Sequence, residues 1–196
     1  MLNRKIIEEL AIGDGILLPG NLEQSISCQV DSAVRPAGVP AHYYRFLFRL
    51  VGLMKPALVL ELGTSYGHSS SVMADACPDS KIITVNIMNE LREECRRQNV
   101  VYVNNDSLVK VDLDRSIDIL FIDTEHDGIR CEKEFDLYCK NLSKDSIVLF
   151  DDIHWTDGMR RFWPSFNPAG FEKFEIPAHG DAGFGVLLPI NEAQEA

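Results

Sequence analysis

Residues 58–71 read LVLELGTSYGHSSS, an apolar run that stops at an acid and continues through a turn with two glycines. The pattern predicts a buried strand that leads into a helix, because glycines tolerate the backbone angles of a tight turn. Such a turn points backbone N–H groups and the positive end of a helix dipole into the crevice at the carboxyl edge of a sheet. A nucleotide-like ligand is therefore the first hypothesis.

The spacing of this turn argues against a dinucleotide. The dinucleotide fingerprint Gly-x-Gly-x-x-Gly has a glycine where this chain has Ser65, and Glu61 stands where it would repel a pyrophosphate. An acid at that position suits a cationic group better. The Glu-x-Gly-x-x-x-Gly turn resembles the first motif of class I S-adenosylmethionine-dependent methyltransferases, in which the acid lies near the methionine amino group. An ordinary strand-turn-helix corner is the alternative, since short glycine motifs often occur without that function.

The composition fits one globular domain that acts on a small molecule. The chain has 196 residues, of which 45% are hydrophobic and 25% charged, and its formal net charge is -11. Nucleic-acid binding needs clustered Lys and Arg, whereas here even Arg92, Arg96 and Arg97 are interleaved with Glu93 and Glu94. We therefore expect a small-molecule substrate and no nucleic-acid partner.

Cysteine usage and apolar runs indicate the compartment. The five cysteines include no CxxC pair, so we expect neither a disulfide framework nor a cysteine zinc site, but reduced thiols in the cytoplasm. The longest apolar stretch, residues 43–62, is interrupted by three basic residues and Pro56. No membrane-spanning helix is expected from it, and the N-terminus lacks a signal-peptide core of the usual length. The expected localisation is cytoplasmic, without a membrane partner.

Predicted strands alternate with predicted helices along the chain. Strands are expected at 58–62, 81–87, 100–103, 117–123 and 146–150, and helices at 3–10, 41–54, 72–76, 89–98 and 131–142. A further short helix is expected to begin with Asp157 as its N-cap and to stop at Pro164. Two last strands, 171–176 and 183–189, have no helix between them and predict an antiparallel hairpin.

That hairpin separates two fold families. A dinucleotide-binding fold would continue with a second βαβ half, whereas a hairpin after the fifth strand resembles the seven-stranded methyltransferase sheet. We predict an α/β fold with a Rossmann-like doubly wound sheet of strand order 3-2-1-4-5-7-6, in which the last strand pair is antiparallel. The domain would span residues 41–196, after an N-terminal cap or lid segment over the Gly- and Pro-rich residues 1–40.

Polar residues follow the predicted strands at their carboxyl ends, where ligands bind in open α/β sheets. They are Glu61, Asn86, Asp106, Asp123, Asp151 and Asp152. Three carboxylates, Asp123, Asp151 and Asp152, would repel one another in an empty buried site, and a hard divalent cation such as Mg2+ would relieve that cost. Solvated strand ends or helix caps are the alternative interpretation.

Three motifs carry a closer resemblance. They are VLELGxxxGxS at residues 59–69, DILFID at 118–123 and VLFDD at 148–152. They resemble the metal-dependent, catechol-type O-methyltransferases and small bacterial relatives that methylate sugar or natural-product hydroxyls. The resemblance covers about residues 55–155 and gives no guide to either end of the chain.

In that family the acid after the fourth strand and the following acid pair bind magnesium. The resemblance therefore implies Asp123, Asp151 and Asp152 as metal ligands. The family pair is often Asp-Asn, so this chain carries one more negative charge. A proton-accepting side chain stands three residues after the strand-four acid in these enzymes, and His126 has that position here.

Histidine titrates near neutral pH, so His126 is the candidate base for a hydroxyl whose pKa a metal lowers. His154, just after the acid pair, is a second candidate. A structural hydrogen-bonding role is the alternative for each of these two histidines.

The resemblance also implies a site for S-adenosylmethionine. Glu61, Gly63, Ser65 and Gly67 would hold the methionine part, Asn86 would meet the ribose hydroxyls, Asp106 and Ser107 would approach the adenine, and Asp123 would also face the cofactor. Asn86 departs from the family, which usually has Asp or Glu at this position. An amide accepts only one hydrogen bond from a diol well, so the departure weakens the expected ribose contact. Glu90 is a candidate to compensate for it.

The expected function is methyl transfer from S-adenosylmethionine to a hydroxyl of a small molecule. Three alternatives stay open: a metal-independent class I methyltransferase acting on an amine, carboxylate or phosphonate, a dinucleotide-dependent oxidoreductase, and a binding module that has lost catalysis. A homodimer is left open as well, because small methyltransferases with short caps often dimerise. The sequence does not identify the acceptor.

Overall fold

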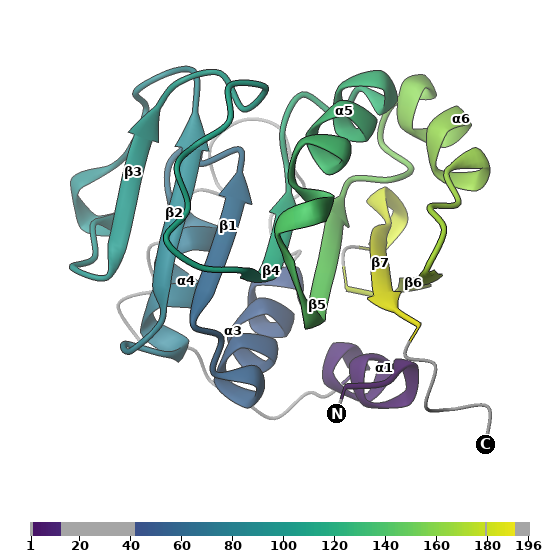
Figure 1. Ribbon diagram of the computed structural model, residues 1–196, viewed down its shortest axis with the longest axis horizontal. Helices are drawn as coiled ribbons and strands as arrows, with labels where there is room; N and C mark the ends of the chain where they lie inside the picture. Colours follow the sequence, from purple (N-terminus) through teal and green to yellow (C-terminus); the bar gives the residue numbers. More distant parts are fainter. Residues whose placement is uncertain (1, 13–41, 179, 191–196) are drawn as a thin grey trace.

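One mixed sheet organises the computed structural model, which describes residues 2–12, 42–178 and 180–190 (Figure 1). The strands described are β1 (Leu58–Leu62), β2 (Lys81–Asn86), β3 (Val100–Asn104), β4 (Ile117–Ile122), β5 (Leu142–Asp151), β6 (Phe171–Ile176) and β7 (Phe184–Pro189). Their order in the sheet is β3-β2-β1-β4-β5-β7-β6. The first five strands pair in parallel, and β7 runs antiparallel to both β5 and β6. This confirms the predicted strand order and the antiparallel hairpin.

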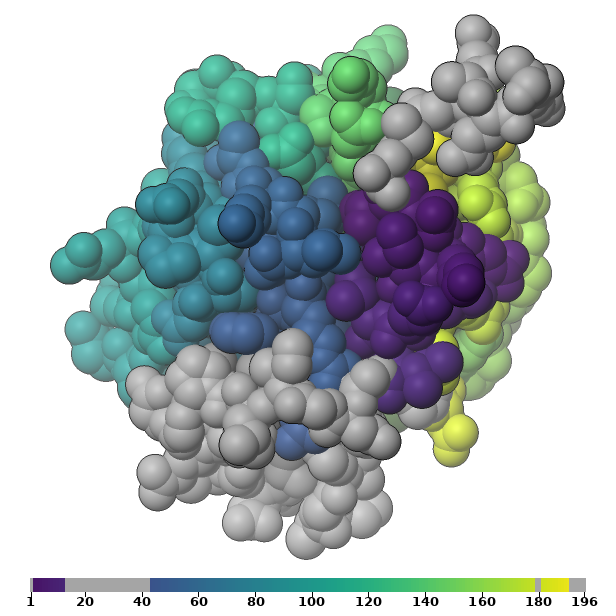
Figure 2. Space-filling view, turned by 90° about the horizontal axis from the view of Figure 1, so that it is seen from below, coloured from purple at the N-terminus to yellow at the C-terminus, as the bar shows by residue number. Residues whose placement is uncertain are grey.

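Helices cover both faces of the sheet. One face carries α1 (Arg4–Ile12), α3 (His42–Met54) and α4 (His68–Ala76), and the other carries α5 (Gly128–Tyr138) and α6 (Asp157–Ser165). In Figure 2, α1 lies beside α3 and close to the C-terminal hairpin. None of the helices in the described ranges has the length and apolar character needed to span a bilayer. The predicted cap or lid, residues 1–40, lies largely outside the described residues.

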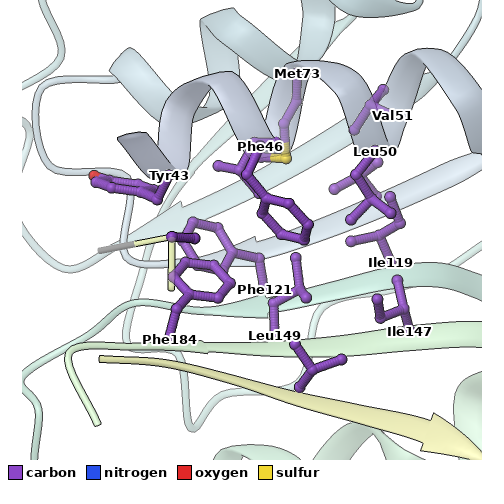
Figure 3. Packing of buried hydrophobic residues seen from close by; sticks show 14 of the residues in the cluster. Tyr43, Phe46, Leu50, Val51, Met73, Ile119, Phe121, Ile147, Leu149 and Phe184 are labelled. Atoms are coloured by element: carbon purple, nitrogen blue, oxygen red, sulfur yellow. The ribbon is translucent and has the colours of Figure 1, made fainter. Parts of the chain in front are cut away.

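Two hydrophobic cores follow from the alternation of side chains along the strands. Val59 of β1 faces the α3 side, whereas Leu58 and Leu60 face α5, and all three are fully buried. A central parallel strand covered on both faces is mostly apolar, which is why residues 58–60 read as a continuous apolar run before Glu61. Figure 3 shows Phe46 and Leu50 of α3 packed over the side chains that β4, β5 and β7 present to this face.

The helix predicted over residues 89–98 does not form. The chain has only a 3-10 turn there, η1 (Glu93–Cys95), and Cys95 is the single buried residue of the segment. A short helix in water depends on packing an apolar face, and this segment has none. Instead, the backbone N–H of Arg92 donates to the carbonyl of Tyr66 at 3.2 Å, which ties the segment to the glycine turn.

Two other helix boundaries were wrong. The helix predicted to reach Leu142 ends at Tyr138 and is followed by the 3-10 turn η2 (Cys139–Asn141), because Leu142 pairs with Ile117 and begins β5. At α6 the N-cap is Thr156, not Asp157. The Thr156 hydroxyl accepts the N–H of Met159 at 3.1 Å. Pro164 lies inside the last turn of α6 and does not stop it.

Two glycines allow a test of the close contact between β1 and β4. Gly63 and Gly170 both have positive φ, 104° and 83°. A Cβ at Gly63 would stand 1.7 Å from the Asp123 carbonyl oxygen, whereas a Cβ at Gly170 would meet nothing within 4 Å. We expect Gly170→Ala to lower the free energy of unfolding by about 1 kcal/mol, from backbone strain alone. Gly63→Ala should cost at least about 3 kcal/mol, measured by urea denaturation. Equal losses in the two variants would contradict the contact.

Candidate active site

The glycine turn brings the ends of β1 and β4 into direct contact. The N–H of Asp123 donates to the carbonyl of Leu62 at 2.8 Å, and Gly63 lies against the Asp123 carbonyl with no room for a side chain. Ser65 has a φ of 43°, in the left-handed region that L-residues enter at a cost of about 1–2 kcal/mol. The turn therefore holds a strained backbone at the carboxyl edge of the sheet.

Two adjoining cavities open at this edge and share four wall residues: Gly63, Ser65, Asp123 and Thr124. The first cavity is lined in addition by Val85, Asn86, Ile87, Met88, Glu90, Ser107, Glu125 and Arg130. The second cavity is lined in addition by Tyr43, Tyr44, Thr64, Tyr66, His68, Ser69, His126, Asp151 and Asp152. Most of the predicted site residues thus meet at one place, as the parallel strand ends require.

Glu61 does not line either cavity. It is fully buried behind the turn, where its Oε2 accepts a hydrogen bond from the hydroxyl of Thr84. The Thr84 hydroxyl in turn lies 2.5 Å from that of Thr64, which does line the second cavity. Burial raises the pKa of Glu61 to about 7, against the opposing effect of hydrogen bonds from nearby hydroxyls. Glu61 therefore reaches the cavity wall through threonine hydroxyls.

The other predicted cofactor residues have different surroundings. Gly67 is the N-cap of α4 with a φ of 90°, and a Cβ there would stand 2.5 Å from Leu91 Cδ1, so its role is to close the turn. The Asn86 side chain lines the first cavity and donates to the Met88 carbonyl at 2.7 Å. Asp106 pairs with Arg130 and is not among the residues that line the two cavities.

Three carboxylates and the imidazole of His126 gather in the second cavity, which His68 also lines. His126 Nε2 lies 3.3 Å from Asp152 Oδ2 and 3.9 Å from Asp123 Oδ1. Asp151 and Asp152 are almost fully buried, and the Asp152 N–H donates to Asp151 Oδ1 at 2.9 Å. Among the described residues, no group of three His, Cys, Asp or Glu side chains is arranged to hold a metal ion as it stands. The oxygen donors nevertheless have the chemistry that hard divalent cations prefer.

His154 lies apart from this group. Its Nε2 is 2.9 Å from Glu175 Oε2 on β6, and Glu175 Oε1 accepts the indole N–H of Trp163 at 2.9 Å. Neither His154 nor Trp163 lines the two cavities. The structure thus brings one of the two candidate bases, His126, to the carboxylates.

Several wall residues were not predicted from sequence. In the second cavity, burial lowers the pKa of His68 to about 4, with Arg92 adding to the shift, and in the described part of the chain its Nε2 has no hydrogen-bond partner. Burial also raises the pKa of the Tyr43 and Tyr44 phenols. Both tyrosines belong to the aromatic stripe at the start of α3, for which the sequence favours packing in the core and leaves a place in a substrate pocket as the alternative.

The comparisons with known proteins agree with this architecture. Residues 60–153 match the model of a family described as a methyltransferase domain. That segment begins in β1 and ends just after the acid pair. It contains the glycine turn and, after the turn, four residues of the second cavity: Asp123, His126, Asp151 and Asp152. No curated protein has a matching sequence.

Solved structures with the same fold are methyltransferases. The O-methyltransferase TomG of Streptomyces achromogenes, in complex with SAM, has a TM-score of 0.67 at 19% identity, over 97% of this chain and 100% of that chain. The SAH-bound methyltransferase PaMTH1 of Podospora anserina has a TM-score of 0.71 at 14% identity, over 97% and 98%. An O-methyltransferase of Bacillus cereus in complex with SAH has a TM-score of 0.65 at 16% identity, over 93% and 97%. At these identities the likeness establishes the fold.

The raised pKa of Glu61 predicts a pH dependence of stability. The folded state keeps the Glu61 proton up to about pH 7, whereas the unfolded state releases it near the ordinary value of 4.5. The contribution of Glu61 to the free energy of unfolding is therefore fully present below pH 4.5 and is lost as the pH rises through 7, by about 3 kcal/mol. Glu61→Gln should remove this loss, so the variant gains stability relative to the wild type between pH 4.5 and 8. Urea denaturation across that range measures it, with Glu172→Gln on the exposed face of β6 as control. Parallel curves for the Glu61 variant and the wild type would contradict the assignment.

Proposed function

We propose that this protein transfers a methyl group from S-adenosylmethionine to a hydroxyl of a small molecule. Its residues 60–153 match a methyltransferase domain. The observation that carries the proposal is the pair of cavities that meet at the glycine turn. One cavity can take the cofactor's nucleoside while the other takes its methionine part and the acceptor. Structures of similar fold that are O-methyltransferases bound to SAM or SAH support the choice of cofactor and reaction.

The first cavity suits the adenosine part of the cofactor. Asn86 stands at the end of β2, where the ribose hydroxyls would lie, and Glu90 shares the cavity as a further acceptor. Ile87 and Met88 provide exposed apolar surface beside it, at 58% exposure each, which suits the face of a purine. Ser107 and Thr124 also line this cavity.

The second cavity suits the transfer itself. Its three aspartates would give it negative charge next to a bound sulfonium ion, and donor and acceptor would lie against each other at the shared wall of Gly63, Ser65 and Asp123. Holding the two reactants in line supplies much of the rate enhancement for a methyl donor that is already reactive. The imidazole of His126 lies against Asp152 through Nε2, so the other ring nitrogen, Nδ1, would receive the acceptor proton.

A magnesium ion is part of the first form of this proposal. Asp123, Asp151 and Asp152 are the residues that would hold it, and it would lower the pKa of the acceptor hydroxyl. A second form is favoured by the position of His126 between Asp123 and Asp152, where its ring is within 3.9 Å of both carboxylates. In that form His126 is the base of a metal-independent methyltransferase.

The two candidate histidines give a matched pair of variants for the base. Methyl transfer can be followed as S-adenosylhomocysteine release over a panel of catechols, sugars and other hydroxyl compounds. His126→Ala should lower the rate by about a hundredfold or more, the usual contribution of a general base, whereas His154→Ala should stay within a few-fold of the wild type. Both variants must bind S-adenosylhomocysteine like the wild type. A loss of activity in His154→Ala alone would contradict the proposal and show that His154 is the base.

Calorimetry separates the two forms of the proposal. Magnesium chloride is titrated into the wild type and into an Asp151→Asn, Asp152→Asn double variant, with and without S-adenosylhomocysteine. The metal-assisted form predicts a binding signal that the double variant loses, together with activity that excess chelator abolishes. Activity that persists in chelator, without a magnesium signal, would establish the metal-independent form. No cofactor binding under any of these conditions would remove the proposed function as a whole.

A further inference from the structure

Glu134 is a fully buried carboxylate that lies behind the first cavity without lining it. Its Oε1 accepts the hydroxyl of Ser107 at 2.5 Å and Nε–H of Arg130 at 3.1 Å, and its Oε2 accepts the hydroxyl of Thr124 at 3.0 Å. All three donors belong to the wall of the first cavity. One side chain therefore contacts three separate wall residues from behind.

The three donors come from three different elements. Ser107 lies in the loop after β3, Thr124 in the loop after β4, and Arg130 in the first turns of α5. The Arg130 guanidinium extends the network, because Nη2 donates to Ser107 Oγ at 2.8 Å and also pairs with Asp106. Asp106 accepts the N–H of Leu108 at 3.0 Å. The network thus joins two loops to one helix.

The chemistry of the network matches an ionised carboxylate. Burial raises the pKa of Glu134, while the donors from Ser107, Thr124 and Arg130 oppose that rise. Every partner donates, so an amide in place of the carboxylate would turn an N–H group toward one of them. The guanidinium of Arg130 is shared by two carboxylates, Glu134 and Asp106. These three groups together therefore carry an excess of negative charge beside the first cavity, which suits a cofactor with a net positive charge.

We propose that Glu134 is a positioning residue for the ligand of the first cavity, acting through Ser107, Thr124 and Arg130. The identity of that ligand as S-adenosylmethionine rests on the proposed function. A residue that only fastened α5 to the sheet would affect stability without affecting binding. A positioning residue affects the affinity of the folded protein for the cofactor, because the wall residues must be in place before the ligand arrives.

The test compares Glu134→Gln with Glu132→Gln, which lies two residues away on the exposed face of the same helix. The probe is S-adenosylhomocysteine, titrated calorimetrically at a temperature where thermal unfolding shows every variant to be folded. We expect the dissociation constant of Glu134→Gln to rise about tenfold, as for loss of a charged hydrogen-bond network. Glu132→Gln should bind like the wild type. Wild-type affinity in folded Glu134→Gln overturns the proposal, whatever its melting temperature.

Two further measurements keep the proposal open to refutation if Glu134→Gln folds poorly. Ser107→Ala and Thr124→Val each remove one donor and should weaken binding by a few-fold, and their effects should not add to that of Glu134→Gln in double variants. Amide hydrogen exchange of the cofactor-free protein should be faster over residues 106–108 and 123–125 in Glu134→Gln than in Glu132→Gln. Unchanged exchange in both loops overturns the positioning role by itself. Failure of the wild type to bind S-adenosylhomocysteine overturns the proposed function instead.

Discussion

The structure depends on the contact between the backbone ends of β1 and β4. Gly63 lies so close to the Asp123 carbonyl that a Cβ has no space, and the Asp123 N–H bonds to Leu62. This contact aligns the glycine turn with the acid that ends β4. Both cavities share Gly63 and Asp123 as wall residues, so the same contact fixes how the two cavities face each other. A side chain at Gly63 would separate the strand ends and the cavities together.

Two buried glutamates show how the site manages charge. Glu134 has a guanidinium and two hydroxyls as donors, and its role is to hold the wall of the first cavity in the proposed scheme. Glu61 receives hydroxyl donors and, within the described part of the chain, has no neighbouring cation that lowers its pKa, so burial raises it to about 7. A cationic group bound in front of the turn would supply the charge that Glu61 lacks. Burial raises the pKa of both acids, and the Arg130 guanidinium opposes that rise at Glu134.

The sequence predicted the parts of the site that the sheet itself brings together. Parallel strands end at one edge, so the convergence of Asp123, Asp151 and Asp152 followed from their positions after β4 and β5. The surroundings of His154 could not be predicted that way. The backbone N–H of His154 donates a hydrogen bond to the carbonyl of Ala182, and its ring contacts the carboxylate of Glu175. Both partners lie more than twenty residues further along the chain. The sequence contains the four-residue spacing of Arg130 and Glu134, but it does not show that Ser107 and Thr124 also donate to Glu134, because they follow two other strands. The missing helix at 89–98 shows that charged sequence without an apolar face does not fix a helix.

Backbone strain is concentrated in the wall of the second cavity. Of the described non-glycine residues, Lys55, Ser65, His126 and Asp152 have φ values in the left-handed region, and the last three line the second cavity. Each such residue costs of order 1–3 kcal/mol and persists only where the surroundings over-determine it. Here the surroundings are the buried strands β1, β4 and β5, which continue directly into these turns. The cores therefore offset the strain that brings a hydroxyl, an imidazole and a carboxylate to one wall. Relaxing any of these turns would stabilise the backbone locally and move a side chain away from the place where a ligand would bind.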